Sequence, residues 1–276
     1  MVHIVTDSTS DIPADFAREL DITVVPAHVI FGNESYDDGV TLTREEFYRR
    51  LVTSSELPTT ASPSAGEFAQ VYQRLGGDII SIHLASKLSG VFNTAHAATQ
   101  LVPDLNVTLF DSTSLAMGLG WQVISAARAA QNGQSVAQIM HLLSDTRPRV
   151  RVYAGLDTLD YVRRSGRVGW AKAVVSQLLH IKPILEVRDG VVTQLERIRT
   201  RHKLIERLKQ LAHELGPLDE LAVQHTRAYA DARVLADDLA AVLPLKRPIV
   251  VCEATTTIGT HIGPNGLGII AVKAKA

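Results

Sequence analysis

Short apolar runs alternate with helix-forming patterns along most of the chain, and this alternation limits the possible folds more than any other feature. Val2–Thr6, Asp78–Leu84 and Asn106–Phe110 have the apolar, β-branched character of strands, and a helical pattern follows each of them. Repeated strand–helix units are typical of a mostly parallel sheet in an α/β protein. Further strands are expected near 22–31, 150–156, 183–187, 191–199, 221–225, 249–253 and 268–272.

Local signals place several helices and turns between these strands. Ser or Thr followed three residues later by Glu or Gln, at Thr43, Ser64 and Ser135, is the capping-box pattern that opens a helix. Asp189-Gly190 separates two strands and predicts a hairpin turn. The Ser-, Thr- and Pro-rich segment 54–63 is expected to be a loop, and 171–179 a helix.

The chain has 276 residues, and at about 150 residues per domain two domains are expected. A polar connection containing Pro148 lies around Asp145–Arg149. It divides the chain into an N-terminal α/β domain, 1–148, and a C-terminal α/β domain, 149–276. Exchange of the segment near 57–76 with the second domain is left open.

Composition excludes several classes of function. Lys and Arg total 28 against 29 Asp and Glu, and aromatic residues make up 5%, so neither phosphate neutralisation nor base stacking is favoured and no nucleic-acid partner is expected. A single cysteine, Cys252, excludes a disulfide framework and a Cys-rich metal site. The N-terminal segment lacks a signal-peptide pattern, and no apolar run reaches the roughly 18 residues of a transmembrane helix. We therefore expect a cytoplasmic protein without a transmembrane segment.

The usual catalytic and nucleotide-binding motifs are missing from the sequence. There is no P-loop, H-E-x-x-H, C-x-x-C or G-x-S-x-G pattern, and Gly118-Leu119-Gly120 lacks the third glycine of a dinucleotide fingerprint. The neighbouring carboxylates Asp37 and Asp38 are interpreted as part of a solvated bend. No complete catalytic set of residues emerges, so the sequence predicts neither an enzyme nor a metal or cofactor site.

Hydroxyl side chains gather where strands lead into helices. In an open α/β sheet these loops converge on the ligand crevice, and a helix N-terminus favours an anion. Taken singly, each hydroxyl is also explained as a helix cap, but their recurrence at the same topological position favours an anion site. The residues concerned are Thr59, Thr60, Ser62, Ser64, Ser86, Ser89, Ser112, Thr113 and Ser114.

The second half contains an uncharged segment and two arginine clusters. Ala254–Val272 has four Gly, four Thr and one His, His261, and is interpreted as a Gly/Thr loop near the site. A solvated surface explains the arginines, but an acidic or anionic partner does so as well. The first cluster is Arg163, Arg164 and Arg167, and the second is Arg197, Arg199 and Arg201. If the strand near 191–199 extends through the second cluster, the period of two along a strand places its three side chains on one face.

A series of short motifs runs through nearly the whole chain. They are T-D-S-T-S-D at 6–11, P-T-T-A-S-P-S at 58–64, L-A-S-K-L-S-G at 84–90, D-S at 111–112, L-D-T-L-D-Y at 156–161, S-G-R-V at 165–168, I-K-P-I-L at 181–185, R-T-R at 199–201 and H-I-G-P at 261–264. In their order and spacing they resemble the DegV family of lipid-binding proteins. The sequence departs from the family pattern at Ala61 and Val91, where a hydroxyl is lost, and at Asn265, which replaces a glycine.

The resemblance implies a two-domain α/β fold, with a mostly parallel sheet in the N-terminal domain and a long-chain fatty acid enclosed between the domains. It implies that Thr60 and Ser89 hold the fatty acid carboxylate. Thr59 and Ser86 are near alternatives, and His261 and Arg167 lie close to the pocket. Proteins of this kind have no cofactor and no catalytic residues of their own.

The resemblance also implies a protein partner. Members of the family present the fatty acid to a separate fatty acid kinase, which phosphorylates the carboxyl group to an acyl phosphate for phospholipid metabolism. We expect Arg199, Arg201 and Arg164 to dock this kinase rather than to contact lipid.

Two other hypotheses stay open. A serine-dependent hydrolase or transferase would use Ser89 or Ser86 with His261 and with Asp7 or Asp111. A nucleotide- or phosphate-binding regulator would use the helix ends and the arginine clusters. The length, saturation and branching of the fatty acid chain, the oligomeric state and the exact domain boundary do not follow from the sequence.

Overall fold

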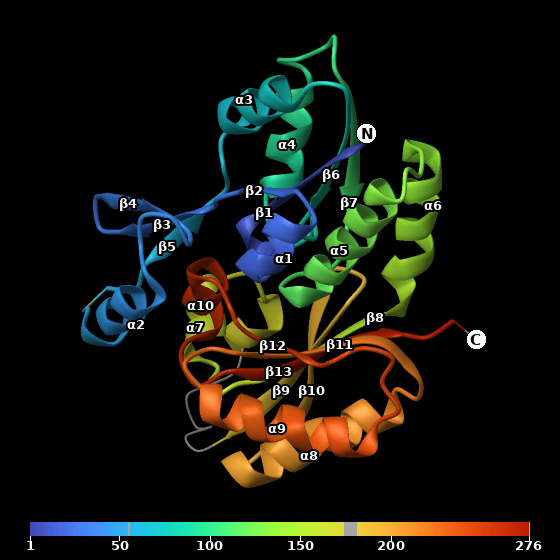
Figure 1. Ribbon diagram of the computed structural model, residues 1–276. Helices are drawn as coiled ribbons and strands as arrows, with labels where there is room; N and C mark the ends of the chain where they lie inside the picture. The colour runs from blue at the N-terminus through green and yellow to red at the C-terminus, as the bar shows by residue number, and fades with distance from the viewer. Residues whose placement is uncertain (55, 174–180, 276) are drawn as a thin grey trace.

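The computed structural model describes residues 1–54, 56–173 and 181–275 and shows an α/β protein with two main sheets, one above the other in Figure 1. The upper sheet is fully parallel, with strand order β2-β1-β6-β7. This confirms the parallel sheet expected for the N-terminal half. Its strands are β1 (His3–Asp7), β2 (Ile22–Val25), β6 (Asp78–His83) and β7 (Asn106–Asp111).

Helices cover both faces of the parallel sheet (Figure 1). Strand side chains alternate between the faces, so Val5 and Ile79 pack under α3 and α4, while Ile4 and Ile80 pack against α5 and α6. Both faces are buried, as a parallel sheet requires. The helices are α1 (Ala14–Glu19), α3 (Ala65–Leu75), α4 (Val91–Thr99), α5 (Met117–Gln131) and α6 (Val136–Thr146).

The lower sheet has six strands and is mixed, with order β10-β9-β8-β13-β11-β12. Helices α8 and α9 cover the face that points away from the upper sheet (Figure 1). The hairpin with Asp189-Gly190 at its turn is confirmed as β9 and β10. The elements are β8 (Val150–Gly155), β9 (Lys182–Arg188), β10 (Val191–Ile198), β11 (Leu218–His225), β12 (Val250–Glu253), β13 (Leu267–Lys273), α8 (Arg201–Glu214) and α9 (Tyr229–Val242).

A third, antiparallel sheet projects from the N-terminal half with helix α2 (Arg44–Thr53) beside it (Figure 1). It contains β3 (His28–Phe31), β4 (Glu34–Asp37) and β5 (Thr59–Ala61). The prediction of one extended segment over 22–31 is wrong, because β2 and β3 belong to different sheets and Pro26 lies between them. Part of the expected loop 54–63 is also a strand, because β5 pairs with β3.

Helix α5 lies between the two main sheets and is buried almost all round. Gly118 and Gly120 allow this close packing, because a Cβ atom would lie 2.7 Å from Val152 Cγ2 at the first position and 2.6 Å from the Ser10 carbonyl oxygen at the second. The Trp121 indole N–H donates to the Ile270 carbonyl oxygen in β13 at 3.2 Å. The Gly-x-Gly pattern therefore serves packing rather than nucleotide binding.

The expectation of a loop in the uncharged segment is wrong for its first part, which forms helix α10 (Thr256–Ile262), whereas the strand expected near 268–272 is confirmed as β13. Four further helical segments are short: η1 (Ser8–Ser10), η2 (Arg147–Arg149), α7 (Asp160–Ser165) and η3 (Gly169–Ala173). The helix predicted for 171–179 lies largely outside the described residues. No helix in the described ranges is long and apolar enough to cross a membrane.

The division at 148/149 stays a prediction, although η2 ends there and β8 begins at Val150. All four strands of the parallel sheet precede this point, and all six of the mixed sheet follow it. Within the segment 57–76, β5 pairs with β3, and α3 packs on the parallel sheet.

Candidate functional site

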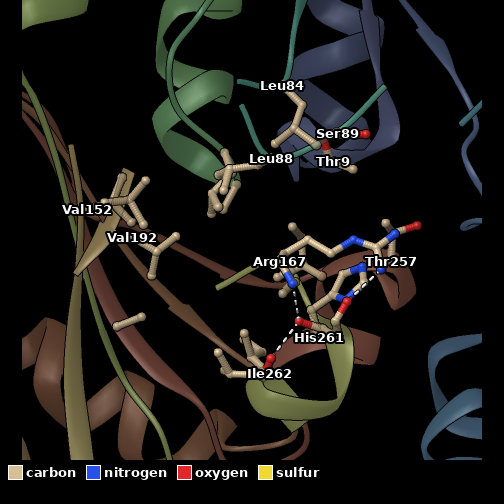
Figure 2. A pocket seen from close by; sticks show the side chains of 18 of the residues that line it. Thr9, Leu84, Leu88, Ser89, Val152, Arg167, Val192, Thr257, His261 and Ile262 are labelled. Atoms are coloured by element: carbon tan, nitrogen blue, oxygen red, sulfur yellow. Dashed lines mark hydrogen bonds between the residues drawn. The ribbon is translucent and has the colours of Figure 1, made fainter. Parts of the chain in front are cut away.

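A cavity of about 550 Å³ lies between the loops at the carboxyl ends of β1 and β6 and the mixed sheet. One wall is apolar and comes mainly from β8, β9, β10 and β13, with Val152 and Val192 visible at this wall in Figure 2. Leu84 and Leu88, from the loop between β6 and α4, lie opposite (Figure 2). A ligand here would contact mainly carbon on these two sides.

Thr60 and His261 form a polar end of the cavity, although 201 positions separate them in the chain. Their side chains are joined by a hydrogen bond of 2.9 Å between Thr60 Oγ1 and His261 Nε2. Strand β5 turns Thr60 toward the cavity. Because side chains alternate along a strand, Thr59 points the other way, is exposed and is not part of the cavity wall. The structure thus separates two candidates that the sequence left together.

The imidazole of His261 is uncharged at neutral pH. Burial, with a smaller contribution from the nearby Arg167 guanidinium, lowers the pKa of His261 from 6.5 to about 4. Its Nδ1 atom is buried and has no hydrogen-bond partner within the described residues. A neutral ring has one N–H and one acceptor nitrogen. The Thr60–His261 pair therefore retains one donor for a ligand, either the Thr60 hydroxyl or the His261 Nδ1–H.

Ser89 and Ser86 both line the cavity from the loop before α4, but their hydroxyl groups make different hydrogen bonds. Ser89 Oγ accepts from the Val91 backbone N–H at 3.3 Å, which leaves its own hydrogen to point elsewhere. Ser86 Oγ donates to a carboxylate oxygen of Asp111 at 2.6 Å. Ser89 is therefore better placed than Ser86 to donate to a ligand.

Arg167 is exposed just after α7 and contributes to the cavity wall. Its Nη1 donates to the Ser165 carbonyl oxygen at 2.7 Å, and no carboxylate in the described ranges forms an ion pair with it. Figure 2 shows Arg167 and His261 on the same side of the cavity. An uncompensated cation thus lies beside the polar end.

The other predicted arginines lie away from the cavity wall. Arg164 is exposed on α7 and Arg199 is exposed after β10. The strand does not extend through Arg197, Arg199 and Arg201, because β10 ends at Ile198 and α8 begins at Arg201, so the condition for placing them on one face is not met. Arg201 instead binds within the chain: its Nε lies 2.7 Å from Asp231 Oδ2, and its Nη1 lies 2.7 Å from the Asn265 carbonyl oxygen.

The serine-hydrolase hypothesis gains no support from this geometry. His261 bonds to Thr60 rather than to Ser86 or Ser89, and Asp7 bonds to His83. A chain with the spacing of a catalytic triad does exist elsewhere: Ser81 Oγ lies 2.7 Å from His83 Nε2, and His83 Nδ1 lies 2.9 Å from Asp7 Oδ2. All three residues are fully buried, so a substrate has no access to them. The apolar wall likewise offers little to a nucleotide.

The buried carboxylates of Asp38 and Asp11 hold the start of α10, and the sequence patterns did not predict this role. Asp38 is 3% exposed, so its interpretation as part of a solvated bend is wrong. It accepts from the Thr256 backbone N–H at 2.9 Å, and Asp11 accepts from the Thr255 backbone N–H at 2.8 Å. More than 200 positions separate these partners, and no local pattern connects them.

The fold and the cavity together define an α/β protein with a cavity that has an apolar wall and a polar end. The model of the DegV family, described as an uncharacterised protein of that family, matches residues 1–274. The chain belongs to the DegV family, as its motifs predicted.

Relatives cover the chain over almost its full length. Protein DegV of Bacillus subtilis is 35% identical over 278 residues, with 97% of this chain and 98% of that protein covered. A fatty acid-binding DegV family protein from Thermus thermophilus has a TM-score of 0.89 and 30% identity, with 99% of each chain covered. A stearic acid-binding protein from Eubacterium ventriosum has a TM-score of 0.89 and 25% identity, with 99% of this chain and 98% of that chain covered. These similarities confirm the predicted fold class.

Proposed function

We propose that this protein binds a long-chain fatty acid in the cavity, with the carboxylate at the Thr60–His261 end. The observation that carries the proposal is the combination of an extended apolar wall with one uncharged, hydrogen-bonding end. Burial of an alkyl chain contributes about 0.8 kcal/mol per CH₂, or roughly 10 kcal/mol gross for 16 carbons. Association costs of about 4–15 kcal/mol reduce this gain. The alkyl chain of the fatty acid therefore supplies most of the binding affinity.

The polar end suits a carboxylate because an ionised carboxylate only accepts hydrogen bonds. Ser89 supplies one hydroxyl, and the Thr60–His261 pair supplies one further donor. Arg167 adds a positive charge close to this end without an ion-pair partner in the described ranges. A buried carboxylate without such donors would take up a proton instead.

We further propose that the protein is not an enzyme itself and presents the carboxylate to a separate fatty acid kinase. In this reaction a carboxylate oxygen attacks the terminal phosphorus of a nucleoside triphosphate, and the nucleoside diphosphate leaves. The exposed Arg167 beside the polar end, with Arg164 and Arg199 on the surface, offers charge to such a partner. Arg201 would first have to give up its bonds to Asp231 and Asn265. We place this reaction in the cytoplasm, where thiols stay reduced, because Cys252 is a free, buried thiol.

The first test of fatty acid binding uses the protein as it is purified. Mass spectrometry after denaturation should release a long-chain fatty acid, and delipidated protein should bind labelled stearate. Thr60→Ala with Ser89→Ala should weaken stearate binding by about a hundredfold or more, since each of the two lost hydrogen bonds to a charged group contributes about 1.5–3 kcal/mol. Thr59→Ala is the matched control, because Thr59 precedes Thr60 but points away from the cavity. A protein that carries no lipid and binds no stearate would overturn the proposal.

The kinase step has its own test. Arg199→Glu should impair phosphorylation of bound stearate by a fatty acid kinase and leave stearate affinity unchanged. Loss of stearate binding in this variant would place Arg199 in the pocket instead. Labelling by a fluorophosphonate probe that Ser89→Ala abolishes would favour the hydrolase hypothesis over a carrier.

A further inference from the structure

Helix α10 carries His261 and is tied at its two ends to different parts of the molecule. It is only seven residues long, so its direction depends on those ties rather than on its own stability. Its first turn is bound by Asp38, which follows β4 in the N-terminal half, and by Asp11, which follows η1. Its last residues lead into a turn held by the C-terminal half.

Asp38 makes the closer set of contacts with the helix. Its carboxylate accepts from the Thr256 backbone N–H at 2.9 Å, the Thr256 hydroxyl at 2.6 Å and the Thr257 backbone N–H at 3.4 Å. Ser8 Oγ donates to the same carboxylate at 2.9 Å and accepts from the Ala27 backbone N–H at 3.1 Å. The carboxylate thus caps a helix from outside it and is itself fixed, through Ser8, to η1 and to Ala27 between β2 and β3.

The opposite end of α10 has little freedom to shift. Thr226 Oγ1 donates to the Gly263 carbonyl oxygen at 2.7 Å and accepts from the Gly266 backbone N–H at 2.7 Å. Gly263 has φ +75°, and a Cβ atom there would lie 2.2 Å from the Tyr161 ring. With this end fixed, the contacts of Asp38 and Asp11 at the start of the helix orient the rest of it, and Asp38 makes more of these contacts.

Two side chains of α10 depend directly on that orientation. Thr257 and His261 are four positions apart, which places them on the same helix face, and both line the cavity. Each has a buried polar atom without a partner in the described ranges, Thr257 Oγ1 and His261 Nδ1. A change in direction of the first turn would move both atoms and lengthen the bond between His261 and Thr60.

We propose that Asp38 is a positioning residue that directs Thr257 and His261 of α10 into the cavity and keeps His261 against Thr60. It acts through these residues and does not touch the ligand. Its effect on ligand affinity rests on the proposed function, while its effect on His261 does not.

The test follows the His261 ring by NMR in delipidated protein, together with stearate affinity. Asp38→Ala should raise the titration midpoint of His261 from about 4 toward its ordinary 6.5, since the ring gains contact with water. It should also weaken stearate binding about tenfold, the loss of one hydrogen bond to a charged group. Asp38→Asn keeps an acceptor oxygen and should restore most of both properties. Asp37→Ala is the control, because Asp37 is the neighbouring residue and bonds to His28 rather than to α10.

A role in stability alone would lower the unfolding temperature and leave the His261 titration unchanged. If Asp38→Ala does not fold, Thr256→Val removes the hydroxyl bond to Asp38 and should move the titration midpoint in the same direction by a smaller amount. Wild-type titration in the folded variants would overturn the proposal, whether or not stearate binds. A wild-type protein that binds no stearate contradicts the proposed function, and the titration still decides the role of Asp38.

Discussion

The two halves of the molecule meet through α5 on one side and around the cavity on the other. At α5 the contact is filled, because 12 of its 15 residues are buried and Gly118 and Gly120 bring it close to β8 and η1. Around the cavity, α10 is held by buried carboxylates, and two of its polar atoms have no hydrogen-bond partner in the part of the chain that the structure describes.

The contact at α5 holds the two halves together, whereas the other contact leaves a cavity between them. The α5 layer gains from close apolar packing, which is not sensitive to pH. The cavity side contains buried titratable groups, and burial shifts their pKa values. Stability measurements should therefore distinguish the two regions.

The largest effect is expected at the centre of the filled contact. Trp121→Ala should lower the free energy of unfolding by about 3–5 kcal/mol, the usual range for truncating a large buried aromatic residue. Urea denaturation of delipidated protein measures it. Val242→Ala is the control, because Val242 is exposed and should change stability by less than about 0.5 kcal/mol. A Trp121 variant as stable as the control would show that α5 does not join the halves.

Asp11 should make the cavity side lose stability as the pH rises. Burial raises the pKa of Asp11 from 3.8 to about 7. Between pH 4 and 7 the unfolded chain releases this proton and the folded protein keeps it, so the free energy of unfolding falls. The loss is on the order of 4 kcal/mol at most. Asp11→Asn should remove this slope in denaturation series at several pH values, and an unchanged slope would contradict the assignment.

His261 should have the opposite pH dependence. Its pKa lies below the ordinary value, so the unfolded chain takes up a proton as the pH falls below 6.5, and the folded protein does so only near pH 4. The free energy of unfolding should decrease across this window by about 3 kcal/mol at most. His261→Gln, which does not titrate, should lack that decrease. A variant that loses stability in parallel with the wild-type protein would refute the prediction.

The smallest effect is expected at Thr257. Its buried hydroxyl has no partner in the described ranges, so Thr257→Val removes an uncompensated polar group. The free energy of unfolding of the delipidated protein should stay within about 1 kcal/mol of wild type or rise. A large decrease in the free energy of unfolding would mean that the Thr257 hydroxyl is hydrogen-bonded in the ligand-free protein. The cavity side would then resemble the α5 side in having its buried groups satisfied.

Sequence patterns located the strands of both main sheets, because strand–helix alternation and the Asp-Gly turn are local signals. They did not separate β2 from β3 or reveal β5 and α10. The first two depend on strand pairing, and α10 is held by residues far away in the sequence. The family motifs led to Thr60, Ser89, His261 and Arg167, all of which line the cavity. Thr59 and Thr60 were separated only by the orientation of β5.

Burial of single side chains was the least predictable property. Asp38 follows Asp37 in a turn-like segment, yet the structure places it under α10, 218 positions away in sequence. Arg201 belongs to an arginine cluster by sequence, but its guanidinium is bonded within the chain. Both outcomes depend on tertiary contacts that a single sequence does not show.

The bond between Thr60 and His261 also has a consequence for the synthesis of the protein. Proteins are made from the N-terminus and their domains begin to fold during synthesis, so Thr60 leaves the ribosome long before its partner. Contacts between such distant residues also form late in folding, because a long loop must close first. A nascent N-terminal half would therefore have its parallel sheet but no finished polar end to the cavity. The bond between Thr60 and His261 would form only when α10 has docked.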